Sequence, residues 1–395
     1  MRIVVIGSGV AGAAAAYELA RSGADTVLVD SAAEGRATSA GAGIICPWTS
    51  RVRDPAWYLL ASAGAEHYPA LLAALSEDGE EDIGYRRVGA LRLLDPGDRE
   101  GAESVRSLVA TRASVSALAG DVSLLTGDEA ARLFPPLRHE GPVLRVEGGA
   151  RLDGRLLRDA LRRAAVRRGA RTVRGTARIE ARDGRVRGVS VGDELVAADG
   201  VVAAAGAWSP ALLGPLGVHV EVTPQRGQIV HLRLPDADAG TGAGVGTGTD
   251  GGAGADTARW PVVLPRSSHY LLAFDGSRVV VGATREEGSG FDHRVTAGGL
   301  AEVLGEALAV APGLAAATHV ETRVGFRPMG PDVRPLLGTV PACEGLVVAN
   351  GLGSSGLTMG PYVGALAARL ALGTPPELDL TPYDPLRRAA AVEGP

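Results

Sequence analysis

In the first thirty residues, apolar runs and glycines follow one another in the pattern expected for a strand, a helix and a second strand. An apolar run at 3–6 leads into the motif GSGVAG at 7–12, an alanine-rich stretch ends at Gly23, and a second apolar run at 26–29 ends on Asp30. A GxGxxG motif in this context is typical of dinucleotide-binding units. The pattern predicts a parallel β-α-β unit that opens an α/β domain.

Each part of this motif has a physical task. Gly7 allows the tight turn, Gly9 lets the backbone approach a pyrophosphate, and Gly12 lets helix and strand pack closely. The start of the helix offers N–H groups and a partial positive charge to phosphates. Asp30 can accept hydrogen bonds from ribose hydroxyls. A glycine-rich turn in an ordinary β-α-β unit is the alternative interpretation.

Hydrophobic periodicity predicts further elements. Helices are expected at 54–76, 99–110, 128–133, 153–169, 297–311 and 357–372. Strands are expected at 85–94, 171–180, 185–191, 195–204, 262–265, 270–274, 278–282 and 345–350. A second GxGxxG, GLGSSG at 351–356, separates the last strand from the last helix. No strand ending in an acid follows it, so we expect this loop to face another part of the first ligand.

Composition narrows the function. The chain has 395 residues, which favours two domains, and its net charge of −5 gives no reason to expect nucleic acid as a partner. All 40 basic residues are arginines, so Schiff-base chemistry on lysine, pyridoxal phosphate anchoring and a Walker lysine are excluded. Cys46 and Cys343 form neither a disulfide framework nor a zinc site, which predicts no metal and a cytoplasmic setting.

Two further features are a possible membrane span and a segment of low complexity. No apolar run reaches the length of a membrane span, so none is expected. Residues 236–258 are of low complexity and predict a flexible insertion in a surface loop.

Several separated segments resemble the flavin-dependent amino-acid oxidoreductases that include D-amino acid dehydrogenase, glycine oxidase and sarcosine oxidase. They follow the family's order over nearly the whole chain. The segments are 7–30, TSAGAGII at 38–45, PQRGQ at 224–228, VVGAT at 280–284, GFRPMGPD at 325–332, PLLG at 335–338 and NGLGSSGLT at 350–358.

The resemblance implies an α/β fold with two parts. The first is a Rossmann-like FAD-binding domain, discontinuous in sequence, for which we expect residues 1–50, 145–220 and 325–385. The second is an α+β substrate domain built on an antiparallel sheet, for which we expect residues 51–144 and 221–324.

The resemblance also implies FAD as the cofactor. Members with covalent flavin carry a cysteine just before the C-terminal motif, and Gly325 stands there, which implies non-covalent binding. The loop at 353–357 is implied to face the flavin pyrimidine edge, where a helix N-terminus stabilises the negative charge of the reduced ring. The residues implied to hold FAD are Gly7, Gly9, Val10, Ala11, Gly12, Asp30, Ser31, Thr38, Ser39, Ala40, Gly43, Ala177, Gly206, Gly353, Ser354, Ser355, Gly356 and Leu357.

The substrate site is implied to centre on Arg327, which in glycine oxidase-like members holds the substrate carboxylate as a bidentate pair. His269 and Tyr270, on an expected strand, are further catalytic candidates for orienting the amine or covering the flavin. Cys46 and Trp48 follow the flavin loop and are candidates for the pocket wall. Packing in the sheet or core is the alternative role for all four of these side chains.

The implied reaction transfers a hydride from the α-carbon of an amino acid to flavin N5, and water converts the resulting imine to a 2-oxo acid. Sarcosine oxidase-like members use a lysine near N5 for reaction with oxygen. The absence of lysine therefore favours a D-amino acid dehydrogenase that passes electrons to a quinone or another carrier. An oxygen-using oxidase of glycine, sarcosine or proline-type amines, a non-catalytic flavin-binding subunit and an NAD-dependent dehydrogenase remain alternatives.

The expected partners are thus a small amino acid or amine and an electron acceptor, either a quinone, another carrier or O2. A homo-oligomer and a peripheral association with the inner face of a membrane are both compatible with the sequence.

Overall fold

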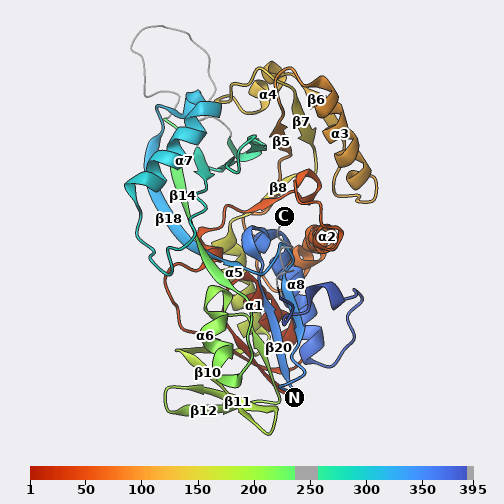
Figure 1. The fold of residues 1–395 in the computed structure, drawn as a ribbon, viewed down its shortest axis with the longest axis vertical. Coiled ribbons are helices and arrows are strands. Elements are labelled where there is room, and N and C mark those ends of the chain that lie inside the picture. Colours follow the sequence, from red (N-terminus) through yellow and green to blue (C-terminus); the bar gives the residue numbers. More distant parts are fainter. Residues whose placement is uncertain (236–256, 389–395) are drawn as a thin grey trace, which may run out of the picture.

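The protein is built around two large sheets that lie toward opposite ends of its long axis (Figure 1). The computed structural model describes residues 1–235 and 257–388. The flexible insertion expected at 236–258 therefore falls almost wholly outside the described residues.

One sheet has six strands in the order β19-β20-β13-β1-β2-β9. All neighbours are parallel except β19 and β20, and β1 pairs with β2 as the first motif predicts. The strands are β1 (Arg2–Ile6), β2 (Asp25–Asp30), β9 (Arg171–Arg174), β13 (Gly200–Ala203), β19 (Leu336–Thr339) and β20 (Leu346–Asn350).

The other large sheet has eight strands in the order β18-β14-β17-β16-β15-β5-β7-β6 and is antiparallel except between β15 and β5. This mixture of a mainly parallel and a mainly antiparallel sheet confirms the predicted fold class. The strands are β5 (Ala90–Leu93), β6 (Val122–Leu125), β7 (Val143–Val146), β14 (Thr223–Arg233), β15 (Val262–Leu264), β16 (Tyr270–Phe274), β17 (Arg278–Gly282) and β18 (Thr318–Met329).

Helices and two small sheets cover these large sheets. The helices are α1 (Val10–Arg21), α2 (Pro55–Glu77), α3 (Arg99–Ala113), α4 (Gly127–Leu133), α5 (Gly154–Arg167), α6 (Ser209–Leu213), α7 (Ala297–Val310) and α8 (Gly356–Ala371). The small sheets are formed by β3 (Ile44–Ile45), β4 (Arg86–Arg87) and β8 (Ala150–Arg151), and by β10 (Ala177–Arg182), β11 (Arg185–Val191) and β12 (Glu194–Ala197).

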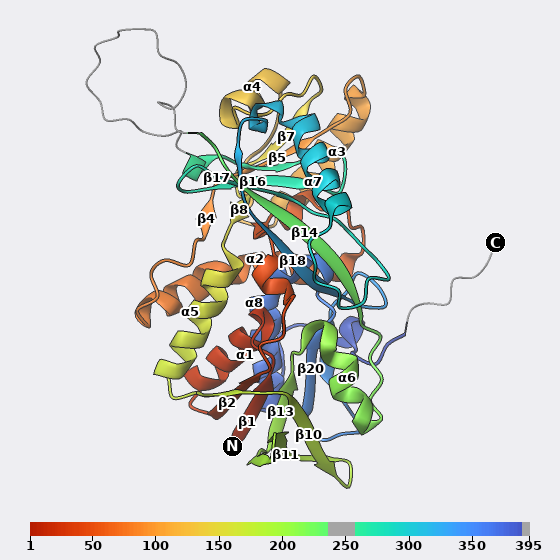
Figure 2. The same ribbon diagram turned by 90° about the vertical axis from the view of Figure 1, so that its left-hand side faces the viewer.

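Strand β1 shows why the first apolar run is hydrophobic at every position. Ile3 and Val5 belong to the core that contains α1, α5 and α8, whereas Val4 and Ile6 belong to the core that contains β10, β11 and β12. Successive side chains of a strand point to opposite faces, so a strand covered on both faces needs apolar residues throughout. Figure 2 shows α1, α5 and α8 beside the sheet, with α6 on its other side.

Three strands predicted from the sequence are wrong in extent, because each is divided. The segment 85–94 forms β4 and β5, which belong to different sheets. The segment 171–180 forms β9 and β10, which belong to different sheets, and 195–204 forms β12 and β13. The Asp199 carboxylate, between β12 and β13, accepts a hydrogen bond of 2.7 Å from the Arg2 backbone N–H. This contact fixes the break, so only Gly200–Ala203 enters the six-stranded sheet.

Strands β14 and β18 were not predicted as strands, yet they position the site. They pair from Thr223 and Met329 at one end to Arg233 and Thr318 at the other. They slope from the eight-stranded sheet toward the six-stranded sheet (Figure 2). The expected domain boundaries at 144/145 and 324/325 fall inside β7 and β18. The rest of the expected division into two domains stays a prediction.

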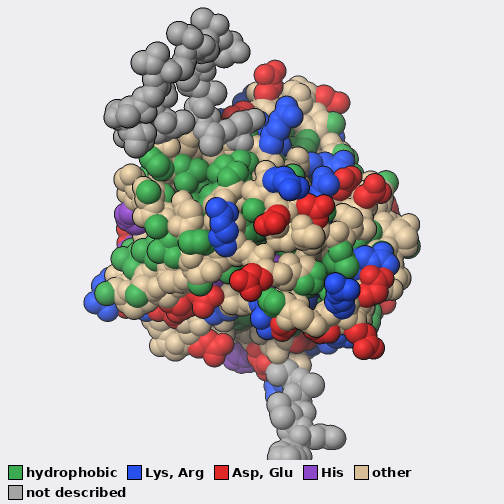
Figure 3. Space-filling view, turned by 90° about the horizontal axis from the view of Figure 1, so that it is seen from above, with side chains coloured by type: hydrophobic (Ala, Val, Ile, Leu, Met, Phe, Trp, Pro, Cys, Tyr) green, Lys and Arg blue, Asp and Glu red, His purple; other side chains and the backbone are tan. Residues whose placement is uncertain are grey.

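Charges of both signs are interspersed over the described surface seen from above, with hydrophobic side chains gathered toward one part of it (Figure 3). The −5 net charge is therefore not concentrated on this face. Within the described residues, no helix is long and apolar enough to cross a membrane.

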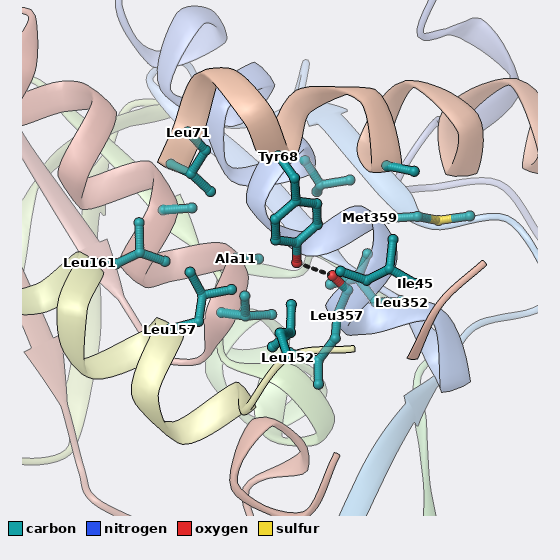
Figure 4. Packing of buried hydrophobic residues seen from close by; sticks show 14 of the residues in the cluster. Ala11, Ile45, Tyr68, Leu71, Leu152, Leu157, Leu161, Leu352, Leu357 and Met359 are labelled. Carbon is teal, nitrogen blue, oxygen red and sulfur yellow. Dashed lines mark hydrogen bonds between the residues drawn. The ribbon is translucent and has the colours of Figure 1, made fainter. Parts of the chain in front are cut away.

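Helix α2 fixes the start of α8, close to the second glycine loop. The Tyr68 hydroxyl donates a hydrogen bond to the Leu357 carbonyl oxygen (Figure 4). A Cβ on Gly64 would lie 2.5 Å from the Thr358 carbonyl oxygen, so the two helices approach closely there. The buried cluster around Tyr68 includes Met359 and therefore holds the first turn of α8 in place.

His231 on β14 makes stability depend on pH. It is buried, and neither ring nitrogen has a hydrogen-bond partner among the described residues. Burial, followed by the positive charge of Arg323, lowers the pKa of the imidazole to about 4. Between about pH 6.5 and that value the unfolded chain binds a proton that the native chain does not, so stability falls as the pH is lowered.

The unfolding free energy of wild type should fall between about pH 7 and about pH 4.5, and we expect His231→Gln to make this fall smaller by about 2 kcal/mol. Unfolding free energies of both proteins at the two pH values provide the measurement. The exposed His319→Gln is the matched control. Equal pH dependence in wild type and His231→Gln would contradict the assignment.

Candidate active site

A cavity of about 930 Å³ connects the two large sheets. At one end it is lined by residues that follow β1, β2, β13 and β20, and at the other by residues of β14, β16 and β18. Ligands of open α/β sheets bind at the carboxyl ends of the strands, where the first end of this cavity lies.

The two outer glycines of the first motif are sterically required. Gly7 has a φ of 101°, and a Cβ there would lie closer than 3.0 Å to the Ala204 carbonyl oxygen. A Cβ on Gly12 would lie closer than 3.0 Å to the Gly7 carbonyl oxygen. Gly12 does not itself line the cavity; it lets α1 start directly against β1, so that the helix N-terminus faces the cavity through Gly9, Val10 and Ala11.

Asp30 ends β2 on the cavity wall. Its carboxylate accepts hydrogen bonds of 2.6 Å from the Ser8 and Ala32 backbone N–H groups and lies 3.2 Å from Arg36 Nη1. Burial raises the pKa of this carboxyl, but those hydrogen bonds and Arg36 outweigh it and hold the pKa below its usual value. Asp30 is therefore ionised and suited to accept hydrogen bonds from ribose hydroxyls. The sequence did not identify its partner Arg36.

The flavin loop expected around residues 38–43 lies across the start of α1. The Thr38 hydroxyl accepts a hydrogen bond of 3.0 Å from the Val10 backbone N–H. Thr38, Ala40 and Gly43 line the cavity, but Ser39 does not. The Ser39 hydroxyl instead accepts a hydrogen bond of 3.3 Å from Arg158 Nη1, so its side chain is held toward α5.

The second glycine loop closes the cavity from the other side. Gly353, Ser354, Ser355, Gly356 and Leu357 all line it, as do Ser31, Ala177 and Gly206. The Asn350 amide donates hydrogen bonds of 2.8 Å to the Gly206 carbonyl oxygen and 2.5 Å to Ser209 Oγ. Asn350 thus joins the loops that follow β13 and β20, a contact that the sequence does not reveal.

These features fit a flavin dinucleotide. One end offers a glycine-lined helix N-terminus for the pyrophosphate and an ionised Asp30 for the ribose. The start of α8 lies at the same cavity and supplies a second positive helix end. Cys343 does not line the cavity, whereas Cys46 does, and non-covalent binding stays a prediction.

Arg327, on β18, lines the part of the cavity that the eight-stranded sheet forms. Its Nη1 donates hydrogen bonds of 3.2 Å to Gln225 Oε1 and 3.0 Å to the Thr284 carbonyl oxygen. Burial lowers the pKa of the guanidinium below its usual value, and the neighbouring Tyr270 offsets part of this decrease by raising the pKa. Among the described residues, no carboxylate lies within 4 Å of this cation.

Tyr270 also lines this end, and burial raises the pKa of its phenol. His269 contributes to the lining too, but its ring nitrogens lie 3.4 Å from Glu302 Oε1 and 3.7 Å from Glu306 Oε2 on α7. Both nitrogens thus face carboxylates of the protein. A catalytic role for either residue stays a prediction.

The two expected pocket-wall residues differ in position. Cys46 lines the cavity, and burial raises the pKa of its thiol to about 11, so it is a thiol and not a nucleophilic thiolate near neutral pH. Trp48 is only 1% exposed and is not among the lining residues. It packs in the hydrophobic core around α2, which corrects its expected position in the pocket.

Three further arginines at the Arg327 end were missed by sequence reasoning: Arg51, Arg92 and Arg285. Each stands alone between unrelated residues, in a chain whose every basic residue is arginine. No local pattern distinguishes them from arginines on the surface. Within the described residues, no group of acids, histidines and cysteines is placed to hold a metal ion.

Known proteins share this architecture over almost the whole chain. The iminodiacetate oxidase of Chelativorans sp. BNC1 has a solved structure that is 47% identical, with a TM-score of 0.89, over 97% of this chain and 99% of that one. The uncharacterized oxidoreductase YurR of Bacillus subtilis (strain 168) is 45% identical over 97% of this chain and 98% of that protein. A glycine oxidase of Pseudomonas putida is 30% identical over 97% of this chain and 98% of that protein.

The family comparison agrees with the cavity. The model of the FAD-dependent oxidoreductases (DAO) matches residues 2–370, which include both glycine loops and Arg327. FAD dependence excludes the NAD-dependent alternative, and the non-catalytic subunit is not supported, because the relatives are enzymes that act on amino or amine donors. The chain belongs to the DAO family of FAD-dependent oxidoreductases and shares its cofactor and its class of reaction.

Proposed function

We propose that this protein is an oxidase of a small amine that carries a carboxylate, either a glycine-type amino acid or its N-substituted form. FAD, when bound, would supply a two-electron acceptor for the hydride of the α-carbon, and O2 would then take up the electrons to give hydrogen peroxide. Water hydrolyses the imine to an oxo acid and an amine. The 47% identical iminodiacetate oxidase and the 30% identical glycine oxidase support an oxidase.

The D-amino acid dehydrogenase expected from the sequence is not confirmed. The observation in its favour is the absence of lysine from the chain. A related D-amino acid dehydrogenase of Xanthobacter autotrophicus is 30% identical, as the glycine oxidase is, so identity alone does not separate the two reactions. We keep it as the second candidate, and peroxide formation distinguishes them.

Arg327 carries the proposal. An arginine has five N–H donors; the hydrogen bonds to Gln225 and Thr284 use Nη1, and one further donor faces the Tyr270 hydroxyl. They fix the plane of the guanidinium and leave donors for a substrate carboxylate. A planar guanidinium suits such a bidentate contact, and its distance from protein carboxylates leaves its charge for the ligand.

The other groups at this end favour positioning over acid–base catalysis. Burial keeps the Tyr270 phenol and the Cys46 thiol protonated near neutral pH, and both His269 nitrogens face Glu302 and Glu306. We infer that the amine must arrive neutral and that the pocket holds it in the geometry for hydride loss. The rate should therefore rise with pH as more of the free substrate amine loses its proton.

Gly227 on β14 provides a test of the position of Arg327. A Cβ at residue 227 would lie 2.5–2.7 Å from the Arg327 guanidinium, which would have to move. We expect Gly227→Ala to raise KM about 10-fold or more, because misplacing a binding group by about 1 Å is costly. Flavin content should stay unchanged.

The control for this change is Gly298→Ala on α7, where a Cβ meets open space. Steady-state kinetics with flavin content measured on the same samples check the expectation. An unchanged KM in Gly227→Ala would show that the guanidinium does not contact the substrate.

The proposal itself is tested by oxygen uptake with glycine, sarcosine, iminodiacetate and D-alanine, with peroxide measured in parallel. One peroxide per amine oxidised supports the oxidase. Oxidation of D-alanine with a quinone, without peroxide, would replace it with the dehydrogenase.

A further inference from the structure

The end of the cavity around Arg327 carries more positive charge than one carboxylate needs. Five lining residues are arginines, whereas Asp30 is the one acid among the lining residues of the described chain. In the whole sequence, by contrast, acidic residues outnumber basic ones, 45 to 40. Arg36 pairs with Asp30, which leaves four lining arginines that have no carboxylate within 4 Å among the described residues.

We propose that this end contains a second anion subsite, formed by Arg51 and Arg285, that binds a second carboxylate of the substrate. The preferred substrate is then an amine with a carboxylate on each side of the nitrogen. This inference rests on the proposed function, in which Arg327 binds the first carboxylate.

The two arginines hold the same loop. Arg51 donates hydrogen bonds of 2.8 Å to the Pro265 carbonyl oxygen and 3.3 Å to the Ser267 carbonyl oxygen. Arg285 donates one of 3.3 Å to the Ser268 carbonyl oxygen. The loop leads directly into Tyr270, which lies beside Arg327. Arg51, before α2, and Arg285, after β17, are both exposed residues that line the cavity, so this loop holds their guanidinium groups at the solvent-facing side of it.

Neither cation is neutralised by the protein. Among the described residues, no carboxylate lies within 4 Å of Arg51, Arg92 or Arg285. Arg92 lies close by, with its Nη1 bonded to the Thr49 carbonyl oxygen at 3.0 Å and its Nε buried without a partner. Burial and then the charge of Arg51 lower the pKa of Arg92 to about 10. Like charges gathered in this way are stabilised by an anion.

The cofactor does not account for this charge. The glycine motif and helix N-terminus that suit the pyrophosphate lie at the Asp30 end, with Arg36. The outer surface in Figure 3 mixes acids with arginines, unlike the cavity. The 47% identical relative is named for iminodiacetate, an amine with two carboxylates, in agreement with this charge distribution.

The kinetic test compares iminodiacetate with sarcosine, which has the same secondary amine and only one carboxylate. We expect wild type to prefer iminodiacetate in kcat/KM by about 10- to 100-fold, the value of a hydrogen bond to a charged group. Arg51→Gln with Arg285→Gln should abolish this preference, because kcat/KM for iminodiacetate should fall about 10- to 100-fold more than kcat/KM for sarcosine. Arg171→Gln, which removes an exposed charge on β9, should change neither substrate.

A binding test does not depend on turnover. Diglycolate and methoxyacetate replace the NH of the two amines with an oxygen, and their binding to the holoenzyme is followed by the change in flavin absorbance. We expect diglycolate to bind wild type at least 10-fold more tightly than methoxyacetate, and the Arg51/Arg285 double variant to bind them equally.

The outcomes separate the two proposals. Equal binding of the two ethers by wild type, or a preference unaffected by the double variant, overturns the second subsite and leaves the oxidase proposal standing. Arginine-dependent binding of diglycolate without oxidation of any amine supports the subsite and overturns the oxidase.

Discussion

Replacing Arg327 with alanine is expected to lower kcat/KM for the amine substrate about 100-fold or more, with FAD still bound. Removing one partner of a buried, charged hydrogen-bonded pair costs about 2–5 kcal/mol. The loss should fall mainly on KM, because the guanidinium binds a carboxylate that takes no part in the hydride transfer. Steady-state kinetics and the flavin absorbance spectrum of the variant provide the measurement.

Arg327→Lys is the informative companion variant. It keeps the charge but loses the planar pair of donors, so we expect it to recover only part of the activity. Arg171→Gln, on the exposed edge strand β9, controls for the loss of a charge. Kinetics of Arg327→Ala that match those of wild type would remove the carboxylate site from this account.

Replacing Gly12 with alanine is expected to weaken FAD binding about 100-fold or more and to lower the melting temperature. A Cβ there would lie closer than 3.0 Å to the Gly7 carbonyl oxygen, so α1 would have to move away from β1. Overpacking of this kind costs about 1–3 kcal/mol or more. The moved helix would also carry its N-terminal N–H groups away from the pyrophosphate.

Flavin titration of the apoprotein and thermal unfolding check this expectation. Gly305→Ala on α7 is the matched control, since its added Cβ meets nothing within 4 Å. If Gly12→Ala retained wild-type affinity for FAD, the first glycine motif would not set the position of the pyrophosphate.

The parts of the fold that were predictable from sequence are those with local signals. The β-α-β unit at the N-terminus was recognisable because strand, glycines, helix and Asp30 follow one another within thirty residues. The helix expected at 153–169 is α5, whose N-cap Asp153 accepts hydrogen bonds from the Arg155 and Leu156 N–H groups. Such caps and periodic stripes need no knowledge of distant segments.

Long-range pairing was not predictable in the same way. Strand β14 contains Pro224, Gln225 and Arg226 and lacks a simple alternation of apolar and polar residues, and its partner β18 is about a hundred positions further along the chain. Their pairing, not their composition, makes them strands. Family resemblance identified Arg327 on β18 and included the segment 224–228, but it assigned no role to Gly227, which lies against the guanidinium.

The site shows the same limit. Trp48 and Ser39 lie in segments next to cavity residues, but the first packs into the core and the second bonds to α5. Arg51 and Arg285 meet at one loop although they are far apart in sequence. Such convergence depends on tertiary structure and leaves no trace in local patterns.

The most direct test of the central claim is anaerobic addition of small amino acids and secondary amines to the purified, FAD-loaded protein, with the flavin absorbance recorded. We expect the oxidised flavin band of wild type to bleach with a carboxylate-bearing amine, whereas Arg327→Ala should need far more substrate for the same bleaching. A flavin that no carboxylate-bearing amine reduces would contradict the central claim.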